Sequence, residues 1–147
     1  MPSIFNQTDN DAIIARINNL APASKAAWGK MNVTQMCKHT NEALMVAFGE
    51  KTVAVPFIFR LFGRLMKDKI FNSEFKKNSP TAREFIFTDE YDFETVKNEL
   101  IKNYRRFTEG HQSIKITKHP FWGDMSYDDW NKLMWNHVDH HLRQFNA

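Results

Sequence analysis

A segment near the C-terminus combines a helical hydrophobic pattern with histidines at positions where apolar residues are expected. Ser126 is a good N-cap, and Asp129 follows three positions later in the manner of a capping box, so a helix is predicted to begin here. Its apolar stripe consists of Trp130, Leu133, Met134, His137 and His141. Two imidazoles therefore replace hydrophobic side chains on the inward face, where their ring nitrogens require partners.

Three further segments show helical spacing and predict an all-α chain. Residues 9–20 repeat isoleucine and leucine after a run of capping residues. Asn32 is expected to cap a helix over residues 33–48, and Asp92 to begin a helix that ends by Gly110. Because the chain contains no linker or repeat, we expect one domain over residues 1–147.

Residues 57–71 predict an additional amphipathic helix between the second and third of these helices. Phe57, Leu61 and Leu65 share one stripe, and basic residues form another. Helices on membrane surfaces show such stripes, but packing against the domain or at a homodimer interface is commoner, so no membrane partner is expected. Residues 72–90 are predicted to be an irregular connection with residues 85–87 extended.

The charge and cysteine content exclude several classes of protein. The net charge is only +3, and no nucleic-acid-binding motif is present, so no nucleic-acid partner is expected. The single Cys37 excludes an internal disulfide, indicates a reducing compartment and is predicted to be a packed core thiol. The N-terminus lacks the pattern of a signal peptide, so we expect a cytoplasmic protein.

The histidine spacing is typical of a metal site. His137 and His141 are four residues apart, so both rings project from one side of a helix and can hold one ion. His39, on the inner border of the helix predicted over residues 33–48, is the natural third ligand. Three nitrogens would leave an open position, as in catalytic zinc sites. The alternative is a set of core histidines, each satisfied by a hydrogen bond.

Two motifs resemble the DinB/YfiT-like superfamily of metalloenzymes. The sequence WNHVDHHLRQF (residues 135–145) is similar to the final helix of that superfamily, and WGKMNVTQMCKH (residues 28–39) is similar to its second helix. With the PFWG turn at residues 120–123, the chain resembles an uncharacterised branch of the superfamily. The resemblance extends from Ala12 to Phe145, although residues 51–90 contain no matching motif.

The resemblance implies an up-down-down-up four-helix bundle with a metal near one end of its core. It implies His39, His137 and His141 as ligands of a divalent ion, zinc or nickel. It also implies transferase chemistry with a low-molecular-weight thiol, whereas general metal chemistry would equally allow hydrolysis of a small-molecule substrate. The alternative is a non-catalytic helical bundle that binds a ligand or partner and keeps a structural or vestigial metal site.

Two residues beside the three histidines are further candidates for the site. Glu42 follows His39 by three positions and would serve as an extra ligand or a hydrogen-bond acceptor, although a surface carboxylate is the commoner outcome. His140 adjoins His141 but points about 100° away on a helix, so it is expected outside the ligand set.

Other side chains are predicted at the pocket or between helices. Trp28 and His119 are candidates for the pocket wall and mouth. Arg143 and Gln144 would reach an anionic substrate or form interhelical contacts, and we favour the structural role for both. Asp139 is expected to be a solvated charge.

Overall fold

The computed structural model describes residues 1–147 and is mostly helical. It contains five α-helices: α1 (Gln7–Asn18), α2 (Val33–Ala47), α3 (Phe57–Phe71), α4 (Phe93–Arg105) and α5 (Tyr127–Gln144). Three short 3-10 helices lie in the connections: η1 (Arg83–Phe85), η2 (Arg106–Glu109) and η3 (His111–Ser113). Strands β1 (Lys118–His119) and β2 (Gly123–Asp124) form a small antiparallel sheet.

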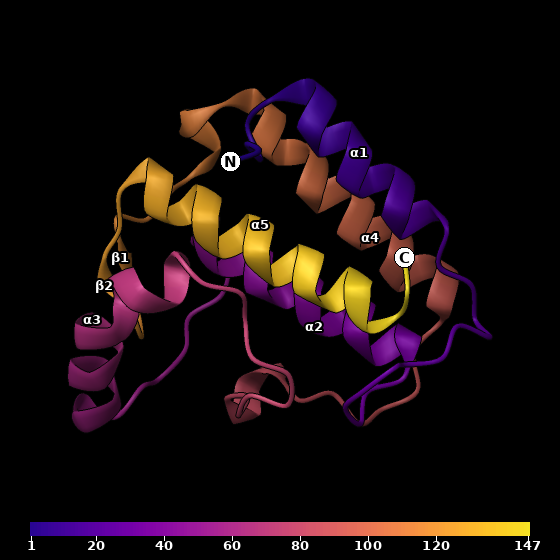
Figure 1. Cartoon of the computed structure of the whole chain (residues 1–147), viewed down its shortest axis with the longest axis horizontal. Coiled ribbons are helices and arrows are strands. Elements are labelled where there is room, and N and C mark those ends of the chain that lie inside the picture. The colour runs from indigo at the N-terminus through magenta and orange to yellow at the C-terminus, as the bar shows by residue number, and fades with distance from the viewer.

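Helices α1, α2, α4 and α5 surround the hydrophobic core. Helix α2 packs against α4 and α5, and α1 packs against the same two helices. In Figure 1, α5 lies in front of α2 and α1 lies beside α4. The core between them includes the fully buried side chains of Tyr104, Phe107 and Trp130. Because α2 and α5 are neighbours, the faces that contain His39 and the C-terminal histidines lie against each other.

The two helices that contain the histidines begin at capping boxes, as predicted. At the start of α2, the Asn32 side chain accepts from the Gln35 amide at 2.8 Å, and Gln35 Oε1 accepts from the Asn32 amide at 3.0 Å. Ser126 and Asp129 exchange the same two bonds at the start of α5, at 3.1 and 2.9 Å. Each cap stabilises its helix by about 1 kcal/mol and fixes where the first turn begins.

Two local predictions differ from the structure, and one small element was not predicted. The first helix begins at Gln7 rather than residue 9, because Asn6 accepts from the Asp9 amide at 3.1 Å and serves as the N-cap. Of residues 85–87, which were predicted to be extended, Phe85 belongs to η1, whereas Ile86 has an extended backbone. The β1–β2 pair was not predicted; strands of two residues are too short to produce an alternating pattern.

Helix α3 has the predicted bounds, but its apolar stripe does not pack against the domain. Phe57, Leu61 and Leu65 are 70%, 44% and 75% exposed, so they do not pack on the other helices; the alternative, packing at a homodimer interface, stays a prediction. The helix is attached through its opposite side, where Gly63 is buried and its backbone lies close to Phe121. No helix combines the length and apolar character needed to cross a membrane.

Candidate metal centre

Three imidazoles converge between α2 and α5. One ring nitrogen from each of His39, His137 and His141 lies within 4.8 Å of the other two. The two closest, Nε2 of His39 and Nε2 of His137, are 3.0 Å apart. Two nitrogens bound to one tetrahedral zinc at about 2.0–2.1 Å lie roughly 3.3 Å apart, so small side-chain shifts would accommodate a common ion. The predicted convergence is confirmed: the three histidines lie close enough to bind a metal ion.

The outer nitrogens of two of these rings are held by oxygen acceptors. Nδ1 of His39 donates to the Phe85 carbonyl at 2.9 Å, and Nδ1 of His141 donates to Oε1 of Gln144 at 2.9 Å. The orientation of the Gln144 amide is defined because its Nε2 donates to the Trp28 carbonyl at 2.8 Å. With the proton on Nδ1, each ring presents the Nε2 lone pair to the common point, as in metal-ligating histidines.

Burial keeps the three rings neutral. Desolvation lowers the pKa of His39, although the Phe85 carbonyl offsets part of this effect. Desolvation, followed by repulsion from the other histidines, lowers the pKa of His137 well below its usual value and the pKa of His141 to about 3. Neutral imidazole is the form that binds metals, so the cluster is ready to coordinate an ion at physiological pH.

The side chains fit a divalent transition metal. His39 and His141 are only 6% and 8% exposed, and the ligand group consists of three histidines without a carboxylate. Nitrogen ligands of this kind suit zinc, nickel, copper or iron. If no ion were present and Nδ1 of His39 carried its proton, one of two facing Nε2 atoms would be forced to donate to the other. A shared ion satisfies both lone pairs at once.

Glu42 and His140 lie outside this group. Glu42 forms ion pairs with Lys38 at 2.9 Å and with Lys51 at 2.8 Å, so its carboxylate is neutralised by lysines rather than directed at the histidines. The ring of His140 packs edge-on against Trp28, with 5.6 Å between the ring centroids. Its position next to His141 on a helix directs it to another face, as predicted.

Asp139 is an ion-pair centre and not the solvated charge that was predicted. Its side chain is 16% exposed. One carboxylate oxygen forms an ion pair with Arg16 at 2.7 Å, and the other accepts from Nε of Arg143 at 2.8 Å. Arg143 also contacts Glu74 at 3.2 Å. These pairs connect α1, α5 and the segment after α3, so Arg143 has the structural contacts that were favoured for it.

His119 organises a turn near the sheet. Its Nδ1 accepts from the backbone amides of Phe121 and Trp122 at 3.0 and 3.3 Å, and burial lowers its pKa to about 4. His119 is therefore not part of the three-histidine group. His111, in contrast, is exposed and stacks on Tyr127 at a centroid distance of 4.0 Å.

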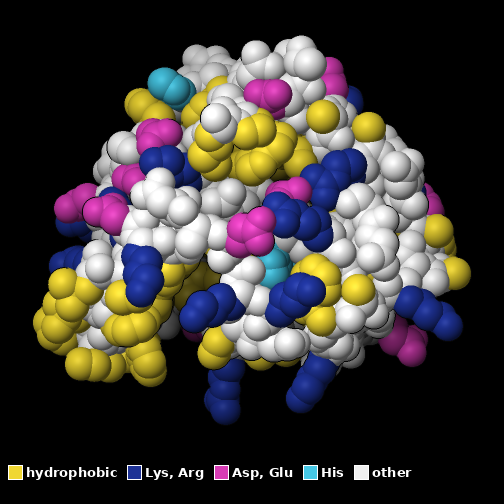
Figure 2. Space-filling model, in the orientation of Figure 1, with side chains coloured by type: hydrophobic (Ala, Val, Ile, Leu, Met, Phe, Trp, Pro, Cys, Tyr) yellow, Lys and Arg dark blue, Asp and Glu magenta, His cyan; other side chains and the backbone are white.

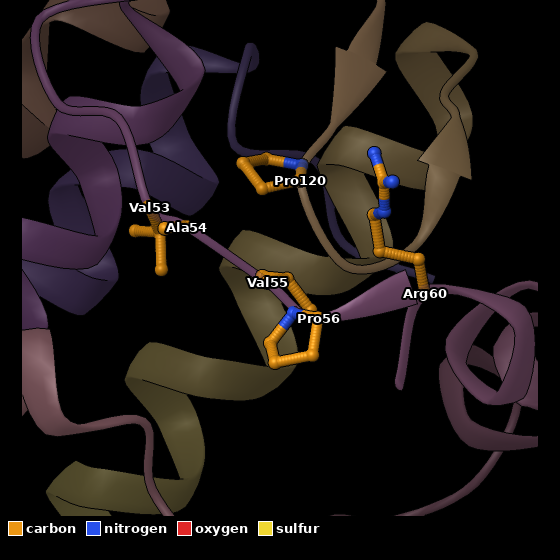
Figure 3. A pocket seen from close by; sticks show the side chains of 6 residues that line it. All are labelled: Val53, Ala54, Val55, Pro56, Arg60 and Pro120. Carbon is orange, nitrogen blue, oxygen red and sulfur yellow. The ribbon is translucent and has the colours of Figure 1, made fainter. Parts of the chain in front are cut away.

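Two cavities lie near the ends of α3. One of about 650 Å³ is lined by 14 residues, among them Trp28, Phe75, Lys77, His140 and Arg143. The other, of about 510 Å³, is lined by Val53, Ala54, Val55, Pro56, Arg60 and Pro120 (Figure 3). None of the three clustered histidines lines either cavity. Trp28 and Arg143 therefore line a space beside His140, but not one that includes the cluster.

Neither oxygen acceptor was predicted from the sequence. Gln144 lies three residues after His141, a spacing that places the two side chains on one helix face, so this contact had a signal in the sequence. The Phe85 acceptor is a backbone carbonyl in the connection between α3 and α4. No side chain marks it, and only the folded chain reveals it.

The fold and the cluster define a mostly helical protein with a three-histidine site of metal-binding geometry. The chain belongs to the family described as "Protein of unknown function (DUF1569)", whose model matches residues 3–147. No curated protein and no solved structure matches the chain. The likeness to the DinB superfamily thus stays a prediction drawn from residues 28–39 and 135–145.

Proposed function

We propose that this protein is a metal-dependent enzyme of the DinB-like type, in which His39, His137 and His141 hold zinc or nickel. The observation that carries the proposal is the convergence of three neutral imidazoles from α2 and α5, two of them with Nδ1 bound to an oxygen acceptor. That arrangement gives the rings the tautomer and orientation that metal binding requires.

The proposal includes a fold assignment. Helices α1, α2, α4 and α5 would be the four helices of an up-down-down-up bundle, with α3 inserted between the second and third. The mutual packing of these four helices around one core supports the assignment. The position of the histidines on α2 and α5 agrees with the second and final helices that supply ligands in the superfamily.

Three nitrogen ligands leave a coordination position for a reactant. A divalent ion held there supplies Lewis acidity, which lowers the pKa of a water or thiol ligand and polarises a substrate carbonyl. The chain's own residues would fix the geometry: the Phe85 carbonyl and Gln144 orient two of the rings. A transferase that uses a low-molecular-weight thiol, or a hydrolase, fits this site.

A second candidate is a non-catalytic helical bundle with a structural or vestigial metal site. It is favoured by one observation: the two cavities near α3 are lined by other residues and not by the clustered histidines. The two candidates differ in whether an added ligand can reach the ion.

Elemental analysis of the purified protein tests the metal site. Wild type and His111→Ala, which removes an exposed histidine elsewhere, should contain one equivalent of metal, whereas His137→Ala should lose it. Absence of stoichiometric metal from wild type after loading with zinc or nickel and gel filtration would refute the proposal.

Cobalt substitution separates the enzyme from the non-catalytic bundle. Addition of a small thiol to the cobalt-loaded protein should produce a thiolate-to-cobalt charge-transfer band. Tight metal binding with no spectral response to thiols, and no hydrolysis of activated esters or amides, would leave only the structural role.

A further inference from the structure

Helix α3 presents a broad apolar face to solvent. Six of its large hydrophobic residues are between 44% and 75% exposed: Phe57, Ile58, Phe59, Leu61, Phe62 and Leu65. Successive residues on a helix are about 100° apart, so all of these side chains except Phe59 occupy one arc of about 140°, opposite the buried Gly63. Single exposed hydrophobic residues are ordinary, but a contiguous cluster on one face marks an interaction surface.

The opposite side of α3 contacts the rest of the domain, so the apolar face points to solvent. Gly63 lies against Phe121, where a β-carbon would come within 2.8 Å of the ring. Lys67 Nζ donates to the Asp124 carbonyl at 2.7 Å and to the Asp129 carboxylate at 3.0 Å. These contacts hold α3 at the edge of the molecule, as Figure 1 shows.

Unpaired basic side chains border the apolar face. Helix α3 contains Arg60, Arg64, Lys67 and Lys69 and one acidic residue, Asp68, so four positive charges minus one negative charge give a net charge of +3. Only Lys67 forms a salt bridge with a carboxylate. Figure 2 shows the hydrophobic cluster of α3 at the lower left, with Lys and Arg side chains at its border and along the lower edge.

The cavity of about 510 Å³ continues the apolar surface beyond the start of α3. Its walls are Val53, Val55 and Pro56 from the segment that leads into the helix and Pro120 from the turn before β2, with Arg60 at the rim (Figure 3). Apolar side chains with a basic residue at their edge therefore occur on both the helix and the adjoining cavity.

We propose that α3 is a docking helix that binds the surface of an anionic phospholipid bilayer. Exposed Phe and Leu side chains would enter the boundary between headgroups and acyl chains, while Arg60 and Lys69 would meet lipid phosphates and carboxylates. A second copy of the chain is a poorer occupant, because pairing two α3 helices would bring Arg60, Arg64 and Lys69, which form no salt bridge, close to the same residues of the other copy, and Asp68 is the only acidic residue of the helix. This surface does not involve the clustered histidines, so the inference does not depend on the proposed function.

Vesicle flotation tests the docking helix. The full-length protein should float with phosphatidylcholine vesicles that contain about a third phosphatidylserine, should bind pure phosphatidylcholine much more weakly, and should be released as the salt concentration rises. Arg60→Gln and Lys69→Gln should each weaken binding to the anionic vesicles roughly five-fold. Leu65→Ser should weaken it about ten-fold or more, because a buried leucine is lost from the membrane interface.

Matched variants outside α3 provide the controls. Ile86→Ser replaces an aliphatic side chain that is 55% exposed, and Lys102→Gln removes an exposed charge on α4; both should bind vesicles like wild type. All of these positions are exposed, so each variant should keep the wild-type circular dichroism spectrum. Failure of the wild type to float, or equal binding to neutral and anionic vesicles, would overturn the proposal. A dimer detected by light scattering would also overturn the proposal if Leu65→Ser dissociates it and anionic vesicles do not compete with it. That result would assign the apolar face to a second copy.

Discussion

Gln144 connects the candidate metal centre to the segment before α2, and its replacement tests the orientation of His141. Its side chain is 3% exposed, accepts from His141 Nδ1 at 2.9 Å and donates to the Trp28 carbonyl at 2.8 Å. Gln144→Ala removes both hydrogen bonds. At about 0.5–1.5 kcal/mol for each bond, the metal-free variant should be less stable than the metal-free wild type by about 1–3 kcal/mol.

The same substitution should also weaken metal binding. Without the Gln144 acceptor, the His141 ring is free to rotate and to exchange tautomers, so part of the binding energy must order it again. Loss of such an outer partner typically costs 10–100-fold in metal affinity, or about 1.4–2.7 kcal/mol. Gln144→Glu provides the contrast, because a carboxylate still accepts from Nδ1 but cannot donate to Trp28. It should lose stability without metal yet bind zinc at least as tightly as wild type.

Two measurements separate these effects. Urea unfolding of the metal-free proteins gives the stability differences, and competition with a chromophoric chelator gives the zinc affinities. The reasoning is refuted if Gln144→Ala binds zinc as tightly as wild type, or if Gln144→Glu loses as much zinc affinity as Gln144→Ala. Either result would mean that the hydrogen bond to Nδ1 does not prepare His141 for coordination.

Three further predictions follow from the geometry. Zinc at a thousand times its dissociation constant should stabilise the protein by about 4 kcal/mol and raise Tm by roughly 8–16 °C, and a chelator should reverse this shift in calorimetry. The pKa of His119 is lowered from 6.5 to about 4 in the folded protein, so the unfolded chain binds a proton first, and stability should fall as pH drops through this interval. His119→Asn, which keeps an acceptor for the turn, should reduce that pH dependence in urea unfolding. Gly63→Ala should destabilise the protein by about 1–3 kcal/mol, because the added carbon collides with Phe121; unchanged unfolding would show that α3 can shift at little cost.

The helices were predictable because their determinants are local. Capping residues at Asn32 and Ser126 mark the starts of α2 and α5, and the spacing of four between His137 and His141 places both rings on one face. His39 could be added because two neighbouring helices pack their apolar faces together, and a histidine at the border of such a face meets its neighbour.

The features that were not predicted depend on contacts between distant parts of the chain. Asp139 seemed a solvated charge because its own helix offers no reason for burial; Arg16, from α1, makes it an ion-pair centre. For α3, periodicity identified an amphipathic helix but not the side that contacts the domain. The buried Gly63 determines which side of α3 contacts the domain. This small residue allows the backbone to approach Phe121 and leaves the larger apolar side chains exposed to solvent.

The choice between a metal site and a set of core histidines depends on the ring atoms, which no sequence pattern specifies. Both readings place imidazoles on an inward face, and both allow one hydrogen bond for each ring. The two interpretations differ in which partners the ring nitrogens have. Core histidines would use one nitrogen as a donor and find a donor for the other. Here the Phe85 carbonyl and Gln144 accept from Nδ1 of His39 and His141, and Nε2 of His39 faces Nε2 of His137. Without a cation, His137 would have to carry its proton on Nε2 and donate to His39, whereas a shared cation would satisfy the inward nitrogens at once. The outer hydrogen bonds therefore prepare His39 and His141 as metal ligands.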